Sequence, residues 1–168
     1  MRFYRLSILI LLSILLTGCG PSGEEKNIQT VIRKYNNNLP IALESQNTTI
    51  LEGLATEKEL GRVLIFTSVM KKENKIVQAK MEKLEFVDIN IEKVVEKGTK
   101  PRNPLDIGGL PKAKAKTKEV WSFQYLDVNT KKPLDKVQKL KYDATFTLVK
   151  QNDQWLVHSI EFKEELVQ

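Results

Sequence analysis

The sequence predicts an α+β domain in which N-terminal helices pack on a curved, four-stranded and mostly antiparallel sheet. Apolar residues recur at helical spacing from residue 24 to about residue 81, and from residue 84 onward Val, Ile and aromatic residues alternate with polar ones. The chain has 168 residues, of which 41% are hydrophobic and 29% charged. This size and composition fit one globular domain plus a targeting segment rather than a disordered or fibrous chain.

The first helix is predicted to begin at a capping box, since Ser22 and Glu25 have the Ser-x-x-Glu spacing. Pro40 removes a backbone donor, so this helix should end or kink near Asn38, with residues 41–45 as an alternative continuation. A short helical turn is expected at residues 47–53. The apolar stripe that defines the helix consists of Ile28, Val31, Ile32, Tyr35 and Leu39.

A second capping box, formed by Thr56 and Glu59, predicts the next helix. Residues 76–81 are expected to add further helical turns. The stripe of this second helix consists of Leu60, Val63, Leu64, Thr67 and Met70.

Four strands should follow, because period-two patterns dominate the rest of the chain. The Pro- and Gly-rich segment 98–111 reads as a long loop between the first two strands. Asn152 and Asp153 tolerate the positive φ of a tight hairpin turn between the last two. The predicted strands cover residues 86–95, 113–128, 137–150 and 155–162.

A two-residue turn at 152–153 also predicts which residues face each other across the hairpin. Leu148 should pair with Val157, Phe146 with Ser159 and Ala144 with Glu161. Extended to the neighbouring strand, the same register places Glu119 beside Ala144, Trp121 beside Tyr142 and Phe123 beside Leu140.

The order of elements and the closing segment 148–157, with Trp155 and Val157 after a polar turn, resemble the nuclear transport factor 2-like superfamily over residues 24–162. Ala113, Ala115, Glu119 and Trp121 resemble membrane-tethered accessory domains of the type found in plastid-division proteins. The resemblance implies a cone in which helices cover a bent sheet and leave a pocket at the open end. Its enzymatic members place an acid/base group there, whereas binding members fill the pocket or use it for a ligand.

The amino terminus has the pattern of a lipoprotein signal peptide. Arg2 and Arg5 precede an apolar run of about 11 residues, which is shorter than the roughly 20 that span a bilayer. Residues 16–19, Leu-Thr-Gly-Cys, resemble a lipobox in which Cys19 takes lipid and becomes the first residue. An ordinary signal peptide with an incidental cysteine is the alternative. The predicted organisation is a signal peptide at 1–18, a lipidated Cys and flexible tether at 19–23, and the domain at 24–168.

The net charge and the numbers of cysteines and histidines argue against several kinds of functional site. Removal of residues 1–18 leaves 25 basic and 21 acidic residues, an excess too small to indicate nucleic-acid binding. Cys19 is the single cysteine and His158 the single histidine, which argues against an internal disulfide, a Cys or His metal cluster and a Ser-His-Asp triad. We expect no metal and no cofactor.

The candidate pocket chemistry is a carboxylate pair. On the predicted register Glu119 and Glu161 flank the small Ala144 on the inner face, beside Trp121 and Tyr142, where burial would raise their pKa values. One β-bulge would instead turn Glu161 outward and bring Leu156, Ile160 and Phe162 in. We expect the aromatic side chains on this inner face to belong to the core.

The outer face offers the second candidate site. An apolar set on that face indicates a protein partner or a homodimer, and His158 there fits a structural or interface role. Alternating lysines at 112–118 read as a solvated face that protects an edge strand, or as a contact for anionic headgroups. The docking candidates are Val120, Val149, Leu156, His158, Ile160 and Phe162.

Taken together, the sequence predicts an envelope lipoprotein, held by Cys19 at the cell membrane or outer membrane and facing an extracytoplasmic space, whose domain binds a protein partner. An enzymatic role is the less favoured interpretation. The alternative is a small-ligand or isomerase/lyase-like pocket that uses Glu119 and Glu161.

Overall fold

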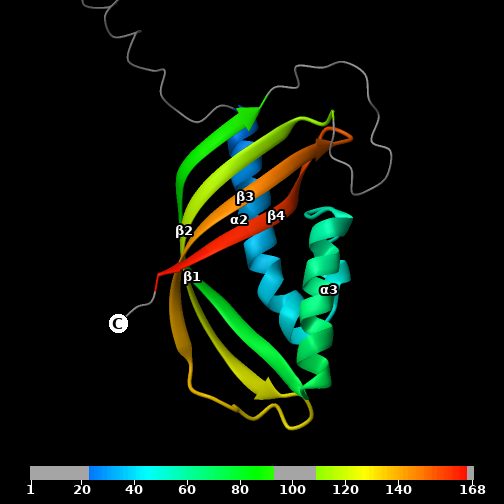
Figure 1. The fold of residues 1–168 in the computed structure, drawn as a ribbon, viewed down its shortest axis with the longest axis vertical. Coiled ribbons are helices and arrows are strands. Elements are labelled where there is room, and N and C mark those ends of the chain that lie inside the picture. Colours follow the sequence, from blue (N-terminus) through cyan, green and yellow to red (C-terminus); the bar gives the residue numbers. More distant parts are fainter. Residues whose placement is uncertain (1–22, 93–108, 166–168) are drawn as a thin grey trace, which may run out of the picture.

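The computed structural model describes residues 23–92 and 109–165, and it has the predicted α+β architecture. Two helices pack on one sheet whose strands follow in sequence order, β1-β2-β3-β4, with every neighbouring pair antiparallel. Figure 1 shows the strands bending around α2 in one half of the molecule and extending beside α3 in the other. The predicted signal peptide, residues 19–22 of the predicted tether, including Cys19, and most of the predicted loop lie outside the described residues.

The elements are α2 (Gly23–Ser45), the short 3-10 helix η1 (Thr48–Leu51), α3 (Glu57–Lys72), β1 (Lys75–Glu92), β2 (Lys112–Asp127), β3 (Gln138–Gln151) and β4 (Gln154–Glu165). Helix α2 continues through Pro40 to Ser45, which is the continuation that the sequence allowed for. One boundary differs from the prediction, because residues 76–81 belong to β1 rather than to a helix. Val77, Ala79 and Met81 alternate with exposed residues, so pairing with β2 determines their conformation.

The core lies between the helices and the inner face of the sheet. Ile28, Ile32 and Tyr35 of α2 have no exposed surface, and Phe146 and Leu148 of β3 face them, equally buried. The alternation of apolar and polar residues that predicted these elements therefore corresponds to one buried face on each helix and strand.

The bend of the sheet has a local cause in β1. Register shifts between Met81 and Lys83 and between Phe86 and Asp88 place extra residues in β1 opposite β2. Such bulges increase the local twist and let a long strand turn. The 18-residue β1 can therefore contribute to both halves of the sheet.

The predicted hairpin turn is confirmed. Asn152 and Asp153 have φ values of 48° and 63°, and Gln151 pairs with Gln154 around them. Positive φ at two consecutive residues is the geometry that matches the twist of a two-residue hairpin.

Beyond the turn, the predicted register of β3 and β4 holds at Leu148 and Val157 and then fails. Thr147 pairs with Ser159, which leaves His158 as an extra residue in β4. Phe146 therefore faces Ile160 instead of Ser159, and Ala144 faces Phe162 instead of Glu161.

The predicted register of β2 and β3 is wrong by two residues. Glu119 pairs with Tyr142, Trp121 with Leu140 and Phe123 with Gln138. Because side chains alternate with a period of two, this shift leaves the aromatic residues on the predicted face.

Candidate functional site

An apolar cavity of about 330 Å³ opens between the inner face of the sheet and the two helices. Residues of α2, α3 and all four strands form its walls, so the bend of the sheet and the position of α3 together define it. Arg62 is the single charged residue among the lining side chains. The lining consists of Leu39, Leu43, Arg62, Val63, Phe66, Val77, Ala79, Trp121, Phe123, Tyr125, Tyr142 and Phe162.

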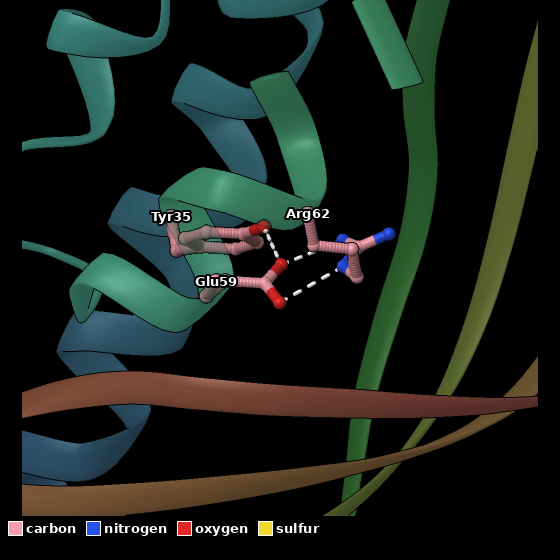
Figure 2. Close-up of polar contacts among 3 residues, drawn as sticks. All are labelled: Tyr35, Glu59 and Arg62. Atoms are coloured by element: carbon pink, nitrogen blue, oxygen red, sulfur yellow. Dashed lines mark hydrogen bonds and ion pairs between the residues drawn. The ribbon is translucent and has the colours of Figure 1, made fainter. Parts of the chain in front are cut away.

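Arg62 is held at the cavity by a buried polar cluster (Figure 2). Its Nε donates to Glu59 Oε2 at 2.9 Å and its Nη2 to Glu59 Oε1 at 2.6 Å. Glu59 also accepts a hydrogen bond from the Tyr35 hydroxyl at 2.5 Å, and its side chain is 1% exposed. Burial, reinforced by Glu59, raises the pKa of Tyr35, and hydrogen bonding to Glu59 raises the pKa of Arg62.

This cluster replaces the predicted capping box. Thr56 is at the N-cap position of α3, but its side chain caps no backbone N–H and instead contacts Nδ1 of His158 at 3.2 Å. Glu59 points into the core rather than back to Thr56. The spacing of Glu59 and Arg62, three residues apart on one helix, is the sequence signal that could have indicated the ion pair.

Glu119 lies in a separate buried cage made only of uncharged donors. The carboxylate accepts hydrogen bonds from Asn36 Nδ2 at 3.0 Å, Thr117 Oγ1 at 2.9 Å and Trp121 Nε1 at 2.8 Å. Desolvation raises the pKa of Glu119, and the three hydrogen bonds oppose part of that effect. Asn36 was not anticipated, because a polar residue beside Tyr35 gives no periodic signal.

The predicted carboxylate pair is not formed. The β-bulge at His158 turns Glu161 to the outer face, where it is exposed and pairs with Thr145. Glu119 is 1% exposed and does not line the cavity. Trp121, which donates a hydrogen bond to Glu119, does line it. Tyr142 also lines the cavity. The two carboxylates therefore cannot act on one bound molecule in this arrangement.

The structure changes the facing or the burial of several predicted docking residues. Ile160 pairs with Phe146 and Phe162 pairs with Ala144, so both side chains lie on the inner face of the sheet. Phe162 also lines the cavity. His158 is 4% exposed and Val149 is fully buried. Val120 and Leu156 remain on the outer face and are partly exposed.

The lysines of β2 do face solvent on the outer side. Lys114, Lys116 and Lys118 are exposed and alternate with the buried residues Ala113, Ala115 and Thr117. However, β2 is a central strand and not the predicted edge, since it pairs with both β1 and β3.

Helix α3 carries an exposed apolar surface, whereas the sequence predicted the docking surface on the outer face of the sheet. Ile65 is 68% exposed, Val69 44% and Phe66 37%. Residues 65, 66 and 69 lie on adjacent positions of the helix surface, and we call them the α3 apolar face. Leu64, further around the helix, is 52% exposed. The face reaches the cavity mouth, because Phe66 belongs to both.

None of the helices in the described residues is long and apolar enough to cross a membrane. Across residues 23–92 and 109–165, no group of three or more His, Cys, Asp or Glu side chains is arranged to hold a metal ion.

No family model matches the chain, and no curated protein matches it. Among solved structures, the intermembrane space region of the chloroplast protein ARC6 is similar, with a TM-score of 0.61 and 9% sequence identity over 86% of this chain and 100% of that one. A putative Ca/calmodulin-dependent kinase II association domain from Exiguobacterium sibiricum covers 90% of this chain and 100% of its own at 10% identity, with a TM-score of 0.46. At these identities the first likeness shows the α+β fold alone.

Proposed function

We propose that this chain is a lipid-anchored protein of a bacterial envelope whose single nuclear transport factor 2-like domain binds a protein partner. Cys19 carries the lipid and residues 1–18 direct export, so the domain faces an extracytoplasmic space. The basis of the anchor is the sequence pattern around residues 16–19. Two acyl chains on one cysteine would hold the domain durably where one chain would not.

The observation that carries partner binding is the α3 apolar face. Three large apolar side chains lie together in solvent on a helix whose opposite side packs against the core through Val63 and Thr67. Exposed apolar residues that adjoin one another and an open cavity are typical of interaction sites, whereas scattered ones are not.

The chemistry of the partner follows from the charges beside this face. Lys71 and Lys72 end α3 next to Val69, and neither forms an ion pair within the described residues. A partner surface with an apolar centre and carboxylates at one side would meet both features. The ARC6 intermembrane space region has a similar fold, which fits a protein-interaction module without specifying its partner.

The anchor is tested with Cys19→Ser in the full-length chain. The parent should incorporate a labelled fatty acid and sediment with membranes, whereas the variant should incorporate no label and stay at precursor length. Acyl labelling of the variant, or a parent that never takes up label, would contradict the anchor without bearing on the α3 apolar face.

The docking surface is tested by matched substitutions in native membranes. Val69→Ser should abolish a crosslinked adduct with a partner protein, and Val87→Ser should leave it intact. Val87 is a suitable control because it is an equally apolar, 54% exposed residue on β1. An adduct that resists Val69→Ser, or one composed of two copies of this chain, would contradict the proposal.

A further inference from the structure

The cavity has a chemistry of its own, distinct from the α3 apolar face except at Phe66. Eleven of its twelve lining residues are aliphatic or aromatic, and polar groups enter through Arg62 and the two tyrosines. Ligand sites commonly have this character, a volume of roughly 300–1,000 Å³ with mostly apolar walls and a few fixed polar groups. The volume of about 330 Å³ lies at the small end of that range.

The apolar part of the cavity is extended. Trp121, Phe123 and Tyr125 occupy alternate positions of β2, which at about 3.3 Å per residue span roughly 13 Å. Leu39 and Leu43 lie one turn apart on α2 and also line it. A wall of this length suits a hydrocarbon chain better than a compact polar molecule.

Arg62 supplies a fixed hydrogen-bond donor at this apolar wall. Glu59 accepts hydrogen bonds from Nε and Nη2 of Arg62 and not from Nη1. Figure 2 shows the remaining guanidinium nitrogen directed away from Glu59 and Tyr35, toward the sheet. The Arg62 side chain is 46% exposed, so a ligand head can reach it from solvent.

We infer that this cavity binds a single-chain amphiphile, with its hydrocarbon chain along the aromatic wall and an oxygen-acceptor head hydrogen-bonded to Arg62. Glu59 balances much of the guanidinium charge, so the head is selected mainly as a hydrogen-bond acceptor. A carboxylate or a hydroxyl meets that requirement. A quaternary ammonium head does not, because it has no acceptor and would meet a cation.

The test uses the full-length protein in zwitterionic lipid nanodiscs. Trp155→Phe leaves Trp121, in the cavity wall, as the single tryptophan. A bromine-substituted decanoic acid should quench Trp121 saturably, and decanoic acid and decan-1-ol should both displace it. Decyltrimethylammonium should compete about ten-fold less well or worse, which corresponds to the loss of roughly one hydrogen bond to a charged group.

Blocking variants locate the ligand. Val77→Phe adds a ring to the cavity wall and should abolish quenching, whereas Val87→Phe makes the same change on the exposed side of β1 and should not. Ala79→Leu is a smaller block that serves if Val77→Phe lowers the melting temperature. Quenching that survives both blocks, or equal competition by the ammonium amphiphile, would overturn the inference. Neither result depends on whether a protein partner exists.

Discussion

At the scale of single residues, Glu119 is a carboxylate that is almost completely buried. Its three partners donate hydrogen bonds but carry no positive charge, and burial raises its pKa. Since the folded state then favours the protonated form, the contribution of Glu119 to stability is complete below the unfolded-state pKa and is lost as pH rises through the folded-state pKa.

We therefore expect Glu119→Gln to gain stability relative to the parent as pH is raised from about 4.5 toward neutrality. Asn36 can reverse its amide to accept from the new side chain, so the cage can accommodate Gln. Urea unfolding at a series of pH values measures the effect, and Glu161→Gln, the same change at an exposed site, is the control. A Glu119→Gln difference that does not vary with pH would contradict the assigned pKa shift.

Tyr35 makes a second prediction at this scale. Tyr35→Phe removes the hydroxyl that donates to buried Glu59, which should cost about 1.5–3 kcal/mol of unfolding free energy, as for other hydrogen bonds to charged groups. Tyr125→Phe removes a hydroxyl from a partly exposed position and should cost less. Equal effects in chemical denaturation would show that the Tyr35 hydroxyl is not anchored as described.

Sequence reasoning located some of these residues but not their contacts. The burial of Trp121 and Phe146 follows from alternation alone. The contacts of Tyr35 with Glu59 and of Asn36 with Glu119 join residues 24 and 83 positions apart in the chain. No local pattern encodes such distances, so only the folded geometry reveals these partners.

At the scale of elements, tertiary packing keeps α2 helical through Pro40, although a proline usually breaks or kinks a helix. Pro40 lies inside the helix, yet the helix continues to Ser45 because Leu39 and Ala42, on either side of it, are buried. The proline removes one backbone hydrogen bond, and the packing of the last turn outweighs that loss.

We predict that Pro40→Ala raises the unfolding free energy, by up to about 3 kcal/mol, because alanine restores the donor and relieves the ring contact. Asn37→Ala, at an exposed site on the same helix, should change stability by less than about 1 kcal/mol. Denaturant titration of both variants provides the comparison. A loss of stability in Pro40→Ala would mean that the proline ring itself packs productively.

The bulge in β4 explains why the candidate sites were placed incorrectly. One additional residue, His158, reverses the facing of everything after it, so Glu161 turns outward and Ile160 and Phe162 turn inward. The contact between His158 and Thr56 holds the extra residue against the start of α3. Period-two reasoning allows for either register, and a tertiary contact decides between them.

At the scale of the whole molecule, the succession of helical and strand periods was sufficient to predict the fold, because each element buries one face against the same core. The connection between α2 and α3 also covers the edge of β4. Thr56 N–H donates to the Val157 carbonyl, and Val157 N–H donates to the Leu54 carbonyl, each at 2.9 Å. The β4 backbone is thus partly protected from pairing with another chain.

The same architecture leaves α3 attached by its inner side and exposed on the other. The cavity and the α3 apolar face both result from this placement, and neither could be derived from the amphipathic pattern. That pattern predicted Leu64 as part of the buried stripe, whereas the side chain is 52% exposed. The α3 apolar face is therefore a property of how α3 sits on the sheet.

Site-specific photocrosslinking in native membranes tests the central claim most directly. A photoreactive residue at position 65, on the α3 apolar face, should give an adduct with a single protein other than this chain. The adduct should disappear when Val69→Ser is added. The same residue at position 118, on the solvated outer face of β2, should give none. Adduct formation at 118 but not at 65, or equal formation at both, would contradict the account.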